Sequence, residues 1–461
     1  MLARARAARI AWPLIDQGVA SLGNFLFTIA LARTLPPQEY GAFALLFGIL
    51  MILYTVMASV LFYPMSVLAD PADRDRIGEL MSVSFILLVG LCVPAGLVLA
   101  VTAFLIGRPD LIAALLVYFL VWQVQEAFRR YLFVELRFGA AVPGEIVSYM
   151  GQILIALWLA LRGDLTLETA LYAMTVTSAA AAVLQGIQVG FSLRRHAMIR
   201  IRTVALEFWR LGGWALANNL CAALRVQFLF WFLAALSGAA LPALLQAGFN
   251  IVNLLNPLMI GLGNVILQVS SRAHAGGKAE AWRATHPLAL SGMPIVIVFL
   301  AAILAFPHEV LGLIYGAHSP YADIATPVRL LAIAALAAFV TDIVCAYFHG
   351  VSQAKQALIV NAAGAVATIP IAIPLIIGFG LNGACIALCL ANAVRLVVLH
   401  LLFTRMIATD TADASSGRVR DQAVPARSAD DPGEAMPAPE PIPVGADRDA
   451  GDFSRATALG R

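Results

Sequence analysis

Long apolar stretches separated by short polar links run through most of this chain and predict an all-α membrane protein. Each stretch is near the ~20 residues that a helix needs to cross ~30 Å of hydrocarbon. The links carry glycine, proline or charge, which end helices. We expect twelve transmembrane helices, at about residues 10–34, 40–63, 79–106, 110–134, 141–161, 166–193, 206–237, 240–269, 287–307, 324–349, 356–378 and 381–406.

A basic link at residues 194–207 falls between the sixth and seventh helices and divides the chain into two halves. A weak sequence echo, Trp12-Pro-Leu-Ile-Asp-Gln against Trp214-Ala-Leu-Ala-Asn-Asn, indicates that the halves are related. We therefore expect two pseudo-symmetric six-helix bundles, at residues 1–200 and 201–407. Residues 408–461 have few large apolar side chains and many prolines, which predicts a disordered cytoplasmic tail.

Composition agrees with a polytopic protein, because 61% of the 461 residues are hydrophobic and only 12% are charged. A soluble domain is about half apolar and about a quarter charged. Basic residues gather before the first helix and in the even-numbered links, whereas the opposite links hold only Arg33, Arg108 and Arg162. By the positive-inside rule, both termini should be cytoplasmic.

Enzyme and cofactor motifs find no support in the sequence. The G-x-G-x-x-G string at residues 378–383 follows a membrane-length helix and has no acidic residue in the next twenty positions, so we interpret it as a helical hairpin turn. Walker A, Gly-x-Ser-x-Gly and His-Glu-x-x-His motifs do not occur. We therefore expect no catalytic residues, no cofactor, no metal site and no nucleic-acid partner.

The seventh predicted helix carries the deepest charge of the chain. A cation at bilayer depth costs from ~2.5 to ~10 kcal/mol or more, so Arg225 must face protein, water or an anion rather than lipid. Asn218 lies seven residues earlier on the same helical face. We expect Arg225, with Asn218, Asn219 and Gln227, to line a solvated cavity and bind substrate.

The eighth predicted helix is rich in asparagine. Asn250 and Asn253 share a face with Pro257, which can bend the helix. A polar helix that bends suits a moving transporter core, and we include both amides among the candidate substrate-binding residues. Amide bonds that only join helices are the alternative.

Ionisable residues inside other helices are candidates for ion coupling or gating, and we assign this role to Asp16, Asp342 and Arg395. The alternative is an internal ion pair, such as Asp342 with Arg395, that only locks helices together. Glu126 and Glu145 lie near helix ends, and we expect both to reach the membrane interface.

Four motifs together resemble the polysaccharide transport family of the multidrug/oligosaccharidyl-lipid/polysaccharide exporter superfamily, whose members flip oligosaccharide repeat units. The motifs are Asp16-Gln-Gly-Val-Ala-Ser-Leu-Gly-Asn24-Phe with Glu39-Tyr-Gly-Ala-Phe, Leu313-Ile-Tyr-Gly with Tyr321-Ala and Arg329-Leu-Leu, Gly350-Val-Ser-Gln-Ala-Lys, and Gly380-Leu-Asn-Gly-Ala. The likeness covers residues 1–407.

The resemblance implies a bacterial inner-membrane protein with a central cavity between two bundles, lined by the first, second, seventh and eighth helices. Asn24 of the first helix thereby joins the candidate substrate-binding residues. The implied function is flipping of undecaprenyl-pyrophosphate-linked oligosaccharides by alternating access, for exopolysaccharide or O-antigen synthesis. Arg225 would receive the pyrophosphate. Membrane lipids and polysaccharide polymerase or export machinery are the other implied partners.

Two other functions stay open. A cation-coupled multidrug antiporter of the same superfamily should have an acidic and aromatic cavity. A non-transporting membrane scaffold for a polysaccharide assembly complex would use residues 408–461 for docking.

Overall fold

The computed structural model describes residues 2–70, 72–190 and 195–422, and over these residues it contains helices and no strand. Short 3-10 or π-helical turns interrupt or join the helices at Ala58–Phe62, Pro109–Leu111, Ile146–Met150, Asn253–Leu255 and His274–Gly276. The α-helices are α1 (Leu2–Thr34), α2 (Pro37–Met57), α3 (Tyr63–Leu68), α4 (Arg74–Leu105), α5 (Ile112–Val134), α6 (Phe138–Glu145), α7 (Gly151–Arg162), α8 (Leu167–Val189), α9 (Arg195–Ser237), α10 (Ala240–Val252), α11 (Asn256–Ala273), α12 (Lys278–Ala305), α13 (Pro307–Tyr315), α14 (Ala325–Gly350) and α15 (Ala354–Gln422).

The predicted all-α membrane fold is confirmed. Within the described part of the chain, eleven helical segments are long and apolar enough to cross a membrane. The last segment, Ala354–Ala408, holds two of the twelve predicted helices, because Gly380 interrupts α15 with φ +53° and ψ −124°. Glycine adopts this left-handed region without strain.

The glycine-rich string at residues 378–383 forms the turn of a helical hairpin, as expected. A Cβ on Gly383 would lie only 1.9 Å from the carbonyl oxygen of Leu375, so the two halves of α15 approach closely at the turn. Farther from the turn, the side chain of Arg395 packs against Gly364. The two halves of α15 therefore run back along each other.

Outward-facing apolar side chains mark the membrane-facing surface. Val93, Leu97 and Phe104 of α4 are 74%, 67% and 70% exposed and share one face of the helix. A contiguous apolar surface of this kind is rare on soluble proteins and typical of a surface that meets lipid. The protein is thus a multi-pass membrane protein.

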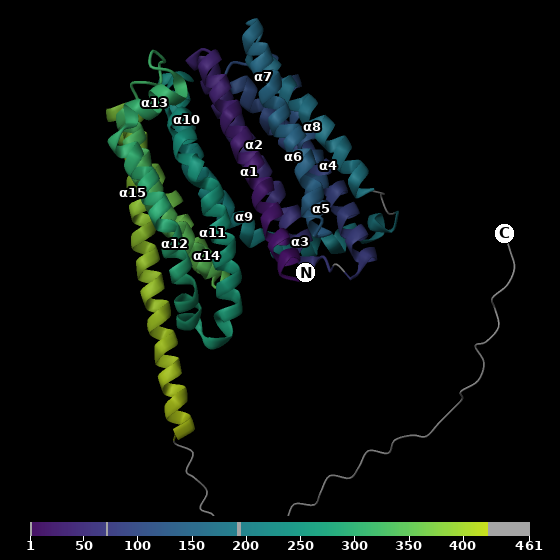
Figure 1. The fold of residues 1–461 in the computed structure, drawn as a ribbon, viewed down its shortest axis with the longest axis vertical. Coiled ribbons are helices and arrows are strands. Elements are labelled where there is room, and N and C mark those ends of the chain that lie inside the picture. Colours follow the sequence, from purple (N-terminus) through teal and green to yellow (C-terminus); the bar gives the residue numbers. More distant parts are fainter. Residues whose placement is uncertain (1, 71, 191–194, 423–461) are drawn as a thin grey trace, which may run out of the picture. The chain divides into compact units, whose positions relative to one another are not determined.

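Residues Met1–Thr411 form one compact unit, whose helices are drawn in chain order from purple to yellow in Figure 1. In its first half α5 packs along α8 and α4, and in its second half α11 packs along α12 and α14. The halves meet where α2 packs against α10 and α9. Gly41 permits this contact, because a Cβ there would lie 1.7 Å from the carbonyl oxygen of Ala239. The division into bundles near residue 200 stays a prediction.

The C-terminal boundary differs from our expectation. Helix α15 continues to Gln422, beyond residue 408, where we placed the start of a disordered tail. Residues 423–461, the rest of the predicted tail, lie outside the described residues.

Candidate functional site

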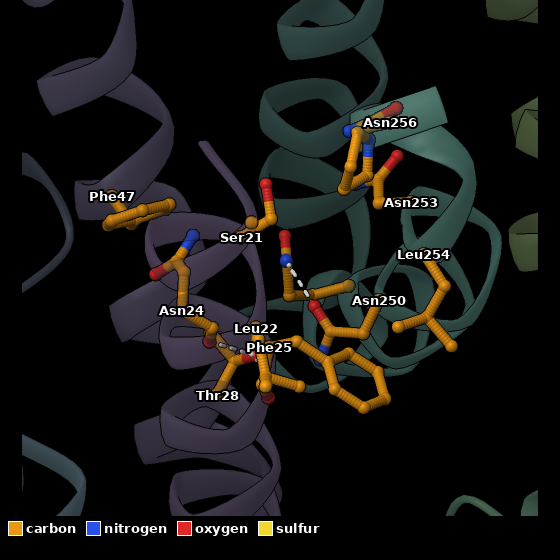
Figure 2. Close-up of a pocket in the computed structure, with 13 residues that line it drawn as sticks. Ser21, Leu22, Asn24, Phe25, Thr28, Phe47, Asn250, Asn253, Leu254 and Asn256 are labelled. Atoms are coloured by element: carbon orange, nitrogen blue, oxygen red, sulfur yellow. Dashed lines mark hydrogen bonds between the residues drawn. The ribbon is translucent and has the colours of Figure 1, made fainter. Parts of the chain in front are cut away.

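An uncharged polar pocket lies between α1 and the junction of α10 with α11 (Figure 2). Its volume is about 280 Å³. None of the described residues that line it is charged; the amide, hydroxyl and aromatic residues of this central pocket are Ser21, Asn24, Phe25, Thr28, Phe47, Gln246, Asn250, Asn253 and Asn256. The structure therefore brings together Asn24, Asn250 and Asn253, three of the predicted substrate-binding residues.

A break in the predicted eighth helix shapes one wall of the central pocket. Helix α10 ends at Val252, a 3-10 turn covers Asn253–Leu255, and α11 begins at Asn256. Pro257 stands in the first turn of α11, where a backbone N–H has no intrahelical acceptor, so proline is well tolerated. The irregular turn thus lies just before Pro257, which we expected to bend this helix, and Asn253 and Asn256 lie at the turn.

Hydrogen bonds close the pocket at the end next to Asn250. The Asn250 Nδ2 donates to the hydroxyls of Tyr40 at 2.8 Å and Tyr315 at 3.3 Å. The Gln246 Nε2 donates to Asn250 Oδ1 at 2.9 Å. Burial raises the pKa of Tyr315, and it raises the pKa of nearby Tyr321 to about 12, so both phenols stay neutral at physiological pH.

Arg33 forms a second set of hydrogen bonds between the two halves. Its Nε donates to the carbonyl oxygen of Ile314 at 2.7 Å, and its Nη2 donates to that of Leu313 at 2.9 Å. These carbonyls belong to the last turn of α13, where backbone acceptors lack intrahelical partners. We call these two bonds the Arg33 latch. Together with Asn250, the latch joins α1 and α2 to α10 and α13.

Five charged side chains form a buried cluster in the first half, which we call the acidic network: Asp16, Glu126, Arg129, Arg130 and Glu145. Arg129 lies at its centre. Its guanidinium bonds Asp16 at 2.6 Å and Glu126 at 2.8 Å, and its Nε lies 3.5 Å from Glu145. Arg130 bonds Glu126 at 2.6 Å. Three carboxylates thus face two guanidinium groups.

Two expectations about this cluster are wrong. Glu126 and Glu145 do not reach the membrane interface, since they are 6% and 2% exposed. Arg129, near the C-terminal end of α5, is buried with them. The opposite charges explain both results, because burial of a carboxylate is tolerated when a guanidinium bonds it.

A second cluster lies in the other half, and we call it the basic network: Arg225, Asp342, Asn361, Asn392 and Arg395. All of its members except Asp342 are buried. The Arg395 Nη2 bonds Asp342 at 2.6 Å and donates to Asn361 Oδ1 at 2.8 Å. Asn392 Oδ1 accepts from Arg225 Nη1 at 2.7 Å and from Arg395 Nη1 at 3.1 Å. The ion pair of Asp342 with Arg395, our structural alternative for these residues, is therefore present.

The polar residues of α9 point in two directions. Asn218 and Arg225 share the predicted face and both contact α15, Asn218 by accepting a 2.9 Å hydrogen bond from Asn361 Nδ2. Asn219 instead donates to Ser59 Oγ at 3.1 Å, and Gln227 packs against Gly48 of α2. The four α9 residues therefore do not form one site, and none of them lines the central pocket.

Arg225 faces protein rather than lipid, with 8% of its surface exposed. It borders a separate cavity of about 130 Å³, together with Asp342 and Asn392. Asn253 and Asn256 line this cavity and also the central pocket, so the two spaces adjoin.

Three residues that organise these clusters were not among the predicted site residues: Arg129, Asn361 and Asn392. A signal existed for each asparagine, since each is an isolated amide within an apolar helix. Arg129 was obscured by its neighbour Arg130, because the pair is typical of a basic link at a helix end.

Comparison with solved structures gives the fold. The chain is similar to a multidrug resistance MATE family transporter of the MOP superfamily in an inward-facing conformation, with a TM-score of 0.71, 16% identity, and coverage of 86% of this chain and 98% of the other. For such a transporter in an outward-facing conformation, the TM-score is 0.62, with 17% identity and coverage of 87% and 95%.

A third similar structure is a MOP superfamily transporter from Pyrococcus furiosus, described by a reversed polarity of its binding pocket that suggests a different function. The TM-score is 0.60, with 16% identity and coverage of 87% of this chain and 95% of the other. No family model matches the sequence, and no curated protein matches it. At these identities the likeness establishes a MATE-like fold.

Proposed function

We propose that this protein is a membrane transporter that works by alternating access and binds its cargo in the central pocket. The observation that carries the proposal is a pocket between the two halves, closed at one end by Asn250 and the Arg33 latch. Asn253 and Asn256 are exposed on the far side of the helix break. The higher TM-score with an inward-facing transporter than with an outward-facing one supports the same state, 0.71 against 0.62.

A cation-coupled multidrug antiporter is the class of transporter that the fold favours. Two of the similar structures are described as multidrug resistance transporters. The acidic network supplies what cation coupling requires, namely buried carboxylates in excess of their guanidinium partners. These two observations support antiport better than they support the oligosaccharide flipping that the sequence resemblance implies.

Flipping of lipid-linked oligosaccharides is the second candidate, and the chemistry of the central pocket favours it. Amides and hydroxyls of Asn24, Asn253 and Ser21 can exchange hydrogen bonds with neutral sugar hydroxyls. Carboxylates, which would attract a cationic drug, do not occur among the described lining residues. The lipid-linked substrate and the polysaccharide assembly machinery stay predictions.

Parallel transport assays separate the two candidates. Vesicles containing the full-length protein would be tested for proton-driven ethidium transport and, separately, for translocation of undecaprenyl-pyrophosphate-linked oligosaccharide. The antiporter proposal expects ethidium transport alone; oligosaccharide translocation alone would establish the second candidate. Activity in neither assay, from folded protein, would contradict both and favour the scaffold.

Asn253→Ala tests whether the cargo occupies the central pocket. Loss of one hydrogen bond in a binding site costs about 1 kcal/mol, so we expect a roughly fivefold rise in KM for the transported cargo. Asn264→Ala is the matched control, since Asn264 is an exposed asparagine of the adjoining helix α11 and does not line the pocket. Equal kinetics for both variants would place the cargo elsewhere.

A further inference from the structure

The basic network holds more positive than negative charge. Arg225 and Arg395 are 8% and 1% exposed, and Asp342 is the carboxylate beside them. Asp342 bonds Arg395, whereas Arg225 makes no ion pair with any residue that the structure describes. A buried cation without a counter-charge costs several kcal/mol. The network is therefore one negative charge short of balance.

Both guanidinium groups converge on one neutral atom. The Asn392 Oδ1 accepts from Arg225 at 2.7 Å and from Arg395 at 3.1 Å. The Asn392 Nδ2 donates to the carbonyl oxygen of Ala334 at 2.9 Å, which fixes the amide with its oxygen toward both cations. Like charges at such separations repel each other, and the neutral amide offsets only part of this repulsion.

Donor groups remain free for a further acceptor. The Nε atoms of Arg225 and Arg395 are buried and have no hydrogen-bond partner within the described chain. An unpaired buried donor costs about 1–3 kcal/mol, and more when it is charged. An anion beside these groups would offset both the missing hydrogen bonds and the missing charge.

Space for an anion is present beside Arg225. The adjoining cavity of about 130 Å³ has Asn392 and Asp342 on its polar side and Phe249, Leu331 and Leu388 among its apolar walls. One water takes about 30 Å³ of the liquid, so the cavity accepts a few water-sized groups. This volume fits a halide or nitrate ion with its water, and it is small for the pyrophosphate and sugar of a glycolipid.

We propose that the second half of the protein binds one small monovalent inorganic anion, such as chloride, in the cavity beside Arg225. The anion neutralises the basic network, and Asn392, which also lines the cavity, holds the Arg225 guanidinium beside it. This site is distinct from the central pocket. The anion binds there regardless of which cargo the transporter carries.

Binding of ³⁶Cl⁻ to the purified full-length protein in detergent tests the proposal. Ionic strength is kept constant with gluconate. We expect one saturable site per chain and at least a tenfold loss of affinity in Arg225→Gln. The matched control is Arg329→Gln, because Arg329 is an exposed arginine of the same half and, among the described residues, its side chain bonds the carbonyl oxygen of Leu304 and no acidic group. No saturable binding, or equal binding in Arg225→Gln, would overturn the proposal.

Asn392→Asp provides a test that does not remove a charged partner. The carboxylate has nearly the shape of the amide and would supply the missing negative charge within reach of both arginines. We expect this variant to bind no ³⁶Cl⁻ and to lose the chloride dependence of its melting temperature. Chloride binding undiminished in Asn392→Asp would contradict the site.

Competition identifies the source of the anion. Nitrate should displace ³⁶Cl⁻, whereas vesicles of phosphatidylglycerol should not. Displacement by the lipid alone would show that the network recognises a headgroup phosphate, which would overturn an inorganic site. Because every measurement is of equilibrium binding, failure here is distinct from failure of the transport assays.

Discussion

The acidic network and the basic network use the same kinds of side chain with opposite balance. In the acidic network three carboxylates meet two guanidinium groups, an excess of one negative charge if all are ionised. In the basic network two guanidinium groups meet one carboxylate, an excess of one positive charge. The two halves thus enclose unlike electrostatic environments.

Geometry differs as well as charge. In the acidic network one arginine, Arg129, forms ion pairs with all three carboxylates. In the basic network a neutral amide, Asn392, accepts hydrogen bonds from both arginines. The first arrangement favours attraction of a cation and the second favours attraction of an anion. Substitution of each centre should therefore have unequal consequences.

Arg129→Gln should produce the largest effect. It leaves Asp16, Glu126 and Glu145 buried with only Arg130 nearby, and breaking a buried ion pair costs about 3–5 kcal/mol. We expect a loss of that size in the free energy of unfolding, measured by chemical denaturation in detergent. Arg137→Gln is the control, since Arg137 pairs with Glu135 at the exposed surface and should change stability by less than about 1 kcal/mol.

Equal losses for both variants would show that the acidic network is not held together by Arg129. The double variant Arg129→Gln with Glu145→Gln sharpens the test. Removing one excess carboxylate should restore part of the stability lost in Arg129→Gln.

Arg395→Gln should cost less, about 1–3 kcal/mol by the same measurement. It breaks the pair with Asp342, but the Asp342 side chain is 49% exposed and can regain water. It also removes the repulsion between Arg395 and Arg225. A loss as large as that of Arg129→Gln would mean that the two networks respond to charge removal alike, contrary to the comparison.

The fold and parts of the site were predictable from the sequence, and the reason is physical. Membrane helices can be identified from the length and apolar composition of a local stretch of sequence. The helices and the hairpin turn at Gly380 were therefore predictable. The shared face of Asn218 and Arg225 follows from helical periodicity alone. The contacts of Arg225 with Asn392 and of Asp16 with Arg129 join positions 167 and 113 residues apart. No local pattern encodes which distant helix supplies such a partner.

The same limit applies to our expectation that Arg225 lines a solvated cavity and binds substrate, which stays a prediction. Burial cost indicates that a charge in a membrane helix needs a polar neighbour, but it does not indicate which one. Asn392 supplies that neighbour, and it comes from α15 rather than from the helices that line the central pocket.

Gly364→Ala should disturb the basic network without changing its charge. A Cβ at Gly364 would lie 2.5 Å from Arg395 Cγ and 3.5 Å from Arg225 Cδ, so the Arg395 stem must move. Overpacking of this kind costs about 1–3 kcal/mol. Gly378→Ala is the control in the same α15 helix, because a Cβ there meets no atom within 4 Å. Equal melting temperatures of the two variants would contradict tight packing of the arginine stems.

Arg33→Gln should have the smallest effect on stability, because the Arg33 latch is exposed and its two hydrogen bonds compete with water. It joins the halves and touches neither network, so we expect a change in unfolding free energy below about 1 kcal/mol. An energy difference of about 1 kcal/mol changes the equilibrium constant between the closed and open states of this end of the pocket about fivefold. Opening of the closed end should therefore become more frequent.

The measurement is the rate at which a membrane-impermeant maleimide, added from the side of the Arg33 latch, labels Asn253→Cys in a background with the native cysteines replaced. Arg33→Gln should raise this rate about fivefold. Arg108→Gln is the control, because Arg108 bonds Glu39 and Asp110, both within the first half. If Arg108→Gln raised the rate as much, loosening within one half would suffice for opening. The bonds between α1 and α13 would then have no separate role in keeping this end of the pocket closed.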